Sequence, residues 1–223
     1  MATEPARTAP RILGLTGPIA CGKTTVGNIL LELGAVERID ADAVVHELMR
    51  PGTAVAQRIL ERFGPEVLRP DGSVDRRRLG EIVFSDERAL RELEAIVHPA
   101  VRERIRARVE ERAGGNGVMV IDAVRLLQSE LLELCDAVWV VRCSAAVSMH
   151  RLTEDRGMSR QAAEARLRAQ PVFEHPRVTL VLDNGGTRES LRAQVEEAWR
   201  SLLSEWNLSD ACVVGDDADG LPR

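Results

Sequence analysis

The segment that most constrains this chain is a glycine-rich stretch near its beginning. An apolar run at 12–16 leads into it, and apolar side chains at helical spacing follow it as far as Gly34. The stretch reads Gly17-Pro18-Ile19-Ala20-Cys21-Gly22-Lys23-Thr24 and fits the pattern GxxxxGK[ST] in full. A strand, a loop and a helix in this order predict a phosphate-binding loop in an α/β fold, although an ordinary glycine-rich turn has the same outline.

Each position of the loop has a chemical reason. The glycines allow consecutive N–H groups to turn toward phosphate oxygens, and the following helix adds the positive end of its dipole. Lys23 is expected to reach the β- and γ-phosphates of ATP, and the Thr24 hydroxyl to bind Mg²⁺. We expect the whole stretch from Gly17 through Thr25 to bind the nucleotide. Within it, Cys21 is either a small filler or a redox-sensitive thiol.

The basic residues are unevenly divided between two types. The chain has 30 lysine and arginine residues, of which Lys23 is the single lysine. Biased coding explains an excess of arginine, but it does not explain why one position keeps an ammonium group. This distribution supports a specific role for Lys23.

Alternating apolar runs and helical patterns predict the fold class. We expect strands at 12–16, 35–39, 118–121, 137–141 and 178–182, with helices between them. This order predicts a three-layer α/β/α P-loop fold around a parallel five-stranded sheet. The expected nucleotide core comprises 11–42, 117–147 and 178–206. A helical insertion at 43–113, with one helix beginning after His98-Pro99, and a helical lid at 148–177 complete the domain, and 1–10 and 207–223 are expected to be disordered tails.

Composition excludes several classes of protein. The net charge is −5, and residues 208–223 contribute −3 of it, so a nucleic-acid partner is not expected. Apolar runs are too short to cross a membrane and 1–10 lacks the pattern of a secretory signal, which favours the cytoplasm. The cysteines at 21, 135, 143 and 212 have no metal-ligand spacing, so we expect reduced thiols and no zinc site.

Carboxylates follow two of the predicted strands. Asp40 and Asp42 follow the second strand, where they can orient or deprotonate a substrate hydroxyl, although an aspartate here is also a good helix cap. Asp122 ends the run VMVI and resembles a carboxylate that assists Mg²⁺, although strand-end aspartates are also common in turns.

Two further segments are candidates for contacts with the nucleotide. Arg151 and Arg156, near the start of the predicted lid, are suited to stabilising a transferring phosphoryl group, unless they belong to a solvated helix face. Asn184 and Gly185 follow the last strand in a tight turn whose backbone is placed to meet the adenine, although a plain turn looks the same.

The order and spacing of short motifs resemble the dephospho-CoA kinase family across most of residues 11–203. The matching pieces are LTGPIACGKTT, DAD at 40–42, RPGT at 50–53, FG at 63–64, DGSVDRRRL at 71–79, HP at 98–99, RL at 151–152, AQ at 169–170 and DNGG at 183–186. The resemblance implies transfer of the ATP γ-phosphoryl group to the ribose 3′-hydroxyl of dephospho-CoA, with Mg²⁺. It implies Asp42 as the orienting or basic carboxylate, Lys23 and Arg151 as clamps, and Arg76 and His98 in the acceptor-binding helical region. From their positions after strands, we also expect Asp40 and Asp122 on the substrate side. We expect a monomer or a weak homo-oligomer.

Two positions depart from the family pattern, and two other functions remain open. Gln128 stands where the family usually has a glutamate, and Thr179 replaces an aspartate. Both changes concern the acceptor substrate and not the phosphate-binding loop. A kinase of another small hydroxyl compound, such as a nucleoside, would share the loop but not need the long insertion. A nucleotide-dependent switch of the GTPase kind would show an Asn-Lys-x-Asp motif, which the single lysine excludes.

Overall fold

The computed structural model describes residues 9–112 and 115–208. The predicted disordered tails therefore lie outside the described residues, apart from 9–10 and 207–208. Contacts divide the chain into two compact units, which we describe separately. The sheet unit comprises Met1–Arg38 with Arg112–Arg223, and the helical unit is Ile39–Glu111.

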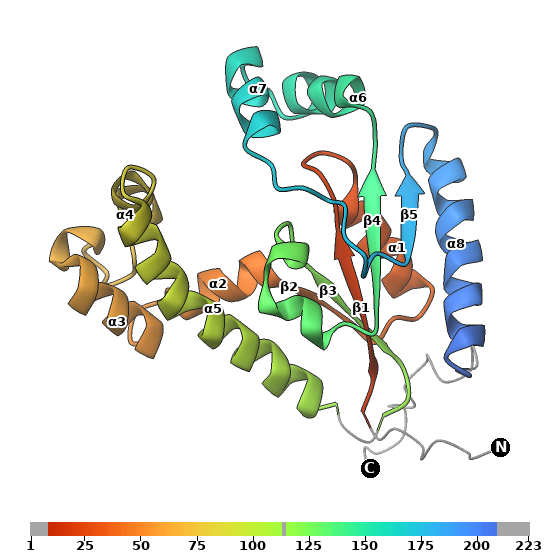
Figure 1. The fold of residues 1–223 in the computed structure, drawn as a ribbon, viewed down its shortest axis with the longest axis horizontal. Coiled ribbons are helices and arrows are strands. Elements are labelled where there is room, and N and C mark those ends of the chain that lie inside the picture. Colours follow the sequence, from red (N-terminus) through yellow and green to blue (C-terminus); the bar gives the residue numbers. More distant parts are fainter. Residues whose placement is uncertain (1–8, 113–114, 209–223) are drawn as a thin grey trace, which may run out of the picture. The chain divides into compact units, whose positions relative to one another are not determined.

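A five-stranded sheet organises the sheet unit (Figure 1). The strands are β1 (Arg11–Thr16), β2 (Glu37–Asp40), β3 (Val118–Asp122), β4 (Ala137–Arg142) and β5 (Leu180–Asp183), in the order β2-β3-β1-β4-β5. The pairs β1–β3, β1–β4 and β4–β5 are parallel, with Leu13 opposite both Val120 and Ala137. The predicted P-loop α/β/α fold is confirmed. β2 starts later than predicted because the N–H of Ala35 still donates to Leu30 O, at 2.8 Å.

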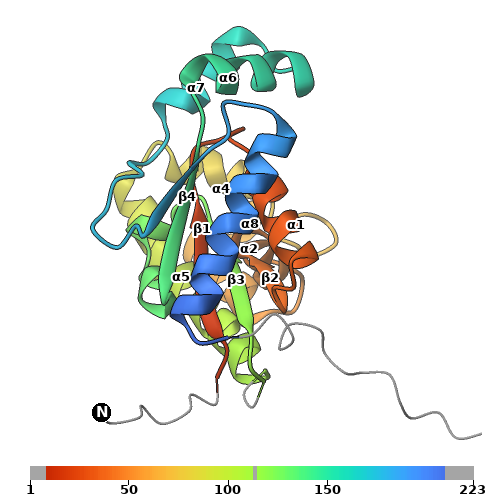
Figure 2. The ribbon, with the colours of Figure 1, turned by 90° about the vertical axis from the view of Figure 1, so that its right-hand side faces the viewer.

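The two faces of β1 have different neighbours. Leu13 and Leu15 are fully buried in an apolar cluster with α1 (Lys23–Glu32) and α8 (Arg188–Glu205), which Figure 2 shows lying along one face of the sheet. Gly14 points to the other face, toward η2 (Leu126–Gln128) and the chain after η3 (Glu130–Leu134). A Cβ there would lie 2.6 Å from Leu126 Cδ2 and 2.8 Å from Cys135 Sγ. The close packing of this connection on β1 thus requires glycine.

The segment after β4, for which a lid is predicted and which we refer to as the lid, is helical and lies beyond the carboxyl end of that strand (Figures 1 and 2). It contains α6 (Ala145–His150), a π-helical turn η4 (Arg151–Asp155) and α7 (Arg160–Arg168). Leu152 and Ala163 are fully buried against Ala20 of the glycine-rich loop. The lid and the loop therefore share a small apolar core of their own.

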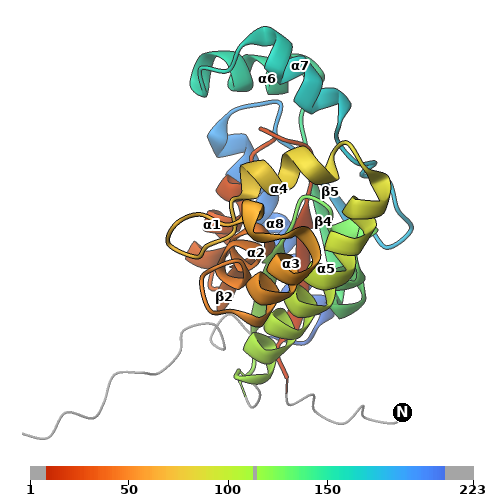
Figure 3. The same ribbon diagram turned by 90° about the vertical axis from the view of Figure 1, so that its left-hand side faces the viewer.

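The helical unit is arranged around one long helix, α5 (Glu87–Glu110), which contacts α2 (Ala41–Leu48), α3 (Ala54–Phe63) and α4 (Arg76–Val83) (Figure 3). A short turn, η1 (Pro65–Val67), follows α3. The prediction that a helix begins after His98-Pro99 is wrong, because Pro99 lies inside α5. Proline has a helical φ, and the carbonyl that it leaves without a donor belongs to Ala95, which is exposed and can bind water.

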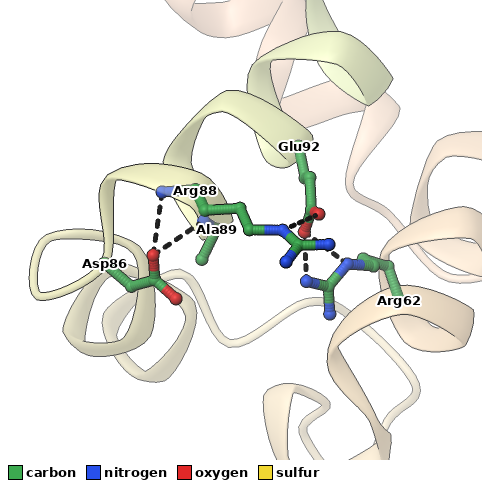
Figure 4. A network of polar contacts seen from close by, with 5 residues as sticks. All are labelled: Arg62, Asp86, Arg88, Ala89 and Glu92. Atoms are coloured by element: carbon green, nitrogen blue, oxygen red, sulfur yellow. Dashed lines mark hydrogen bonds and ion pairs between the residues drawn. The ribbon is translucent and has the colours of Figure 1, made fainter.

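The amino end of α5 is fixed by a network of polar contacts (Figure 4). Asp86 Oδ1 accepts hydrogen bonds from the N–H groups of Arg88, at 2.8 Å, and Ala89, at 3.3 Å. One turn later, Glu92 accepts from Arg88 of its own helix and pairs with Arg62 of α3. The cap is local to α5, whereas the pair between Glu92 and Arg62 joins two helices.

Replacing Asp86 with alanine is expected to destabilise the protein by about 1 kcal/mol, because two N–H groups at the helix end lose their acceptor. Asp86→Asn keeps an acceptor oxygen and should stay within a few tenths of a kcal/mol of the parent chain. Urea unfolding followed by circular dichroism measures both. Equal losses in the two variants would show that the charge of Asp86, and not its cap, is what matters.

Candidate active site

The glycine-rich loop connects the carboxyl end of β1 to the first turn of α1. Gly17 has φ 143° and a Cβ there would lie 2.2 Å from Val141 O. Gly22 has φ 96° and a Cβ there would lie 2.2 Å from Asn184 Nδ2. Both ends of the loop thus exclude any side chain, for conformational and for steric reasons.

Three side chains from elsewhere in the sheet unit hold the main chain of the loop. Asn184, which follows β5, donates from Nδ2 to Cys21 O at 2.8 Å. Arg151 donates to Ala20 O and to Asn184 O, both at 3.1 Å. Gln170, at the end of the lid, accepts from the Ile19 N–H at 2.6 Å. The structure therefore brings the predicted Arg151 and Asn184 onto the loop, and it adds Gln170, to which the AQ motif had given no role.

A cavity of about 460 Å³ opens beside the loop and the start of α1. Four cationic residues, Lys23, Arg151, Arg156 and Arg188, are among its lining residues, together with the acidic residues Glu32 and Asp155. The remaining lining residues are Ala20, Gly22, Thr24, Thr25, Asn28, Ile29, Asn184, Gly186 and Leu191. Lys23 Nζ donates to Gly17 O at 2.9 Å, which places the ammonium group across the loop. The size and the excess of positive charge suit a polyphosphate ligand.

The predicted nucleotide-binding residues do not all line this cavity. Gly17, Pro18, Ile19 and Cys21 belong to the loop but lie outside the lining. Gly185 is also outside the lining. Its N–H donates to Asp183 Oδ1 at 2.9 Å within the turn.

The lining also contains polar residues to which the sequence analysis had given no role, among them Asn28 and Arg188. Asn28 lies one helical turn after Thr24, and Arg188 starts the helix after the DNGG motif. Helical spacing from Thr24 could have found Asn28, and nearness in sequence to the DNGG motif could have found Arg188.

The carboxylates predicted for the acceptor side have different surroundings. Asp122 ends β3 and is 8% exposed. Asp40 is the N-cap of α2, and its Oδ1 accepts from the Ala43 N–H at 3.1 Å, so the capping interpretation holds for this residue. Asp42 lies in the first turn of α2 with an exposed side chain. Of the DAD motif, Asp42 is thus the aspartate whose carboxylate does not cap α2.

Two predicted acceptor residues lie on separate helices of the helical unit. Arg76, the first residue of α4, contacts the His46 ring of α2. His98 is exposed on α5. No role was predicted for His46, because a single histidine on a helix has no distinguishing signal.

The two positions that depart from the family pattern both make hydrogen bonds within the sheet unit. Gln128 donates from Nε2 to Val172 O at 2.6 Å, in the segment that returns from the lid. Thr179 Oγ1 lies 3.0 Å from Val138 O and 3.2 Å from Val138 N, beside the start of β4. Both side chains therefore have structural partners, and neither lines the cavity.

The oxidation state of two cysteines differs from the prediction. Cys21 and Cys143 form a disulfide, so the prediction of reduced thiols is wrong for this pair. They are 122 residues apart, but β1 and β4 are neighbouring strands, and each cysteine lies in the segment that leaves its strand. Sequence spacing does not reveal such a pair. Cys135 is a free, buried thiol, and Cys212 lies outside the described residues.

Cys135 is expected to resist alkylation in the native protein. Burial raises the pKa of its thiol to about 12, so at pH 8.5 the group keeps its proton and the reactive thiolate is scarce. Iodoacetamide followed by mass spectrometry should leave peptide 126–142 unmodified until urea unfolds the chain. Rapid labelling without urea would show that the thiol is accessible and ionised.

Comparisons with known proteins point to one family. The family model for dephospho-CoA kinase matches residues 11–190. A dephospho-CoA kinase from Symbiobacterium thermophilum is 48% identical over 86% of this chain and 81% of its own length. One from Geobacter sulfurreducens is 44% identical over 84% and 96%. The crystal structure of TT1252 from Thermus thermophilus has a TM-score of 0.70 and 30% identity, covering 88% of this chain and 98% of that one.

Among the described residues there is neither a helix suited to crossing a membrane nor a group of three or more metal-ligating side chains.

Proposed function

Because this chain belongs to the dephospho-CoA kinase family, we propose that it transfers the γ-phosphoryl group of ATP to the ribose 3′-hydroxyl of dephospho-CoA, forming CoA and ADP. The observation that carries the proposal is the cationic cavity at the glycine-rich loop, in a chain whose family match runs from residue 11 to 190. A phosphoryl transferase needs positioned positive charge more than covalent chemistry, and this cavity supplies it.

The donor side follows from the loop. The amino end of α1 and the Lys23 ammonium group are placed to bind the terminal phosphates of ATP. Arg151 positions the loop through Ala20 O, and Arg156 and Arg188 add charge on the cavity wall. These guanidinium groups would balance the negative charge that spreads over the phosphoryl oxygens during transfer.

The residues present also fit Mg²⁺. The ion prefers oxygen ligands and is usually held by one or two protein groups together with substrate phosphates. Thr24 lines the cavity and would offer its hydroxyl, and Asp122, which ends β3 outside this lining, would offer a carboxylate. When bound, the ion would neutralise phosphate charge and hold the transferring group in line.

On the acceptor side, we assign the orienting or basic carboxylate to Asp42. Its side chain is exposed, whereas Asp40 is engaged in capping α2. A carboxylate that accepts a hydrogen bond from the substrate hydroxyl orients it and takes its proton during transfer. Arg76 with His46, and His98, belong to the same helical unit and would contact the acceptor.

The position of the new phosphate tests the reaction. Incubation with ATP, Mg²⁺ and dephospho-CoA should give one ADP for each CoA formed. A ³¹P–¹H correlation spectrum should couple the new phosphorus to the ribose H3′. Coupling to H2′, or ADP formation with no phosphorylated acceptor, would contradict the proposal.

A further inference from the structure

The disulfide between Cys21 and Cys143 joins the phosphate-binding loop to the start of the lid. The two Cα atoms are 5.3 Å apart, a separation that a disulfide spans without backbone movement. Cys143 follows β4 and precedes α6 by a single residue, Ser144. We propose that this pair is a reversible thiol–disulfide modification site, and that oxidation lowers the affinity of the loop for nucleotides.

A buried serine hydroxyl lies beside both sulfur atoms. The Ser148 hydroxyl lies 3.3 Å from Cys21 Sγ and 3.2 Å from Cys143 Sγ, and it donates to Ile19 O at 3.2 Å. Ser148 is 2% exposed and Cys21 is 0% exposed, whereas Cys143 is half-buried. An external thiol therefore reaches Cys143 first, and the sulfur that leaves belongs to Cys21. Cys21 lies beside the amino end of α1, where the helix dipole favours negative charge.

The disulfide restrains the part of the loop that must turn toward phosphate. The N–H of Cys21 donates to Pro18 O at 3.3 Å, and its carbonyl accepts from Asn184 at 2.8 Å. With the side chain bonded to Cys143 as well, Cys21 is held at its N–H, its carbonyl and its sulfur. Phosphate binding by such loops uses N–H groups that are free to face the ligand. Reduction releases the sulfur and lets the Cys21 N–H turn.

The chemistry is a thiol–disulfide exchange with a low-molecular-weight disulfide, RSSR. The Cys143 thiolate attacks RSSR, forming a mixed disulfide and releasing one RS⁻. The Cys21 thiolate then attacks the Cys143 sulfur, closing the protein disulfide and releasing the second RS⁻. Two electrons pass from the protein sulfurs to RSSR, and a dithiol reverses both steps.

Peptide mapping tests whether the site exists. Trypsin cleaves after Arg11, Lys23, Arg142 and Arg151, so each cysteine of the pair falls in a peptide with one thiol, 12–23 or 143–151. Cys135 falls in 126–142 and Cys212 in 201–223. After equilibration with oxidised dithiothreitol, mass spectrometry should find 12–23 linked to 143–151, and reduced dithiothreitol should separate them. Absence of the linked peptide under oxidising conditions would overturn the proposal.

Titration calorimetry with ADP tests the consequence, which rests on the proposed nucleotide site but not on the acceptor. The oxidised protein should bind ADP about tenfold more weakly, the effect of losing roughly one charge-assisted hydrogen bond. Cys143→Ala should bind ADP as the reduced parent does and be insensitive to oxidised dithiothreitol. Cys135→Ala, the matched control, should keep the full response.

The possible failures are distinguishable. Equal ADP affinity in the linked and reduced proteins, or a loss of affinity that persists in Cys143→Ala, would overturn the redox proposal. A reduced protein that binds ADP with the predicted redox response but does not phosphorylate dephospho-CoA would contradict the proposed acceptor alone.

Discussion

Replacing Lys23 with alanine is expected to lower kcat by about 100-fold or more, because a charge close to the transferring phosphoryl group stabilises the transition state most. Lys23 lines the cavity and its Nζ donates to Gly17 O at 2.9 Å, so the substitution leaves the loop without its ammonium group but the core untouched. Steady-state ATP consumption measures the effect. Turnover at the parental rate would remove Lys23 from the phosphate site.

Two controls separate charge from geometry at this position. Lys23→Arg keeps the charge, but its larger planar group does not suit a site that holds a compact ammonium group, so most of the loss should remain. Arg200→Ala removes an exposed cation of α8 outside the cavity lining, and it should keep kcat within about twofold, since screened charges outside a site have small effects. A large loss in Arg200→Ala would mean that general electrostatics, and not Lys23 in particular, drives the rate.

The second large effect is expected at Asp42. Asp42→Asn removes the carboxylate that we assign to the acceptor hydroxyl, and kcat should fall by about 10²- to 10⁴-fold, the usual contribution of a positioned base. The substitution changes one atom of an exposed side chain in the first turn of α2, so the fold should persist. Single-turnover kinetics at saturating ATP measure the transfer step, and ADP affinity should stay near the parental value.

Asp40→Asn is the matched control for this prediction. Asparagine caps a helix about as well as aspartate, so the bond to the Ala43 N–H should survive and kcat should change much less than in Asp42→Asn. The reverse ranking, with Asp40→Asn as the slower enzyme, would move the base to Asp40. If Asp42→Asn lowered ADP affinity and left transfer unchanged, Asp42 would belong to the donor side.

Local sequence signals predicted the parts of the fold that depend on local interactions. The glycine-rich motif and the buried apolar runs identified the loop and the five strands, because each rests on residues close in sequence, and the alternation of strands and helices predicted a parallel sheet. The order of the strands in the sheet was not predicted. Pro99 was misread, since proline usually marks a helix start, yet the exposed face of α5 tolerates the missing hydrogen bond. The strength of tertiary packing along α5 could not be judged from the local pattern.

Contacts between segments far apart in the sequence could not be predicted from local sequence patterns. Cys143 reaches Cys21 because β1 and β4 are neighbouring strands, and Gln170 reaches the Ile19 N–H because the chain that follows β4 returns to the loop. The spacing of residues along the chain does not predict which distant segments lie close together. The roles of Asp42, Arg76 and His98 in the acceptor site stay predictions that the variants above and acceptor binding must test.

The central claim is tested most directly by comparing acceptors. Purified, reduced protein with ATP and Mg²⁺ is given dephospho-CoA, adenosine, AMP, shikimate or no acceptor, and ADP formation is followed in a coupled assay. The account predicts turnover that depends on dephospho-CoA, with kcat/KM at least about 100-fold above that for any other compound, as expected when binding energy from a large acceptor contributes to the transition state. Turnover with adenosine or shikimate and none with dephospho-CoA would contradict it.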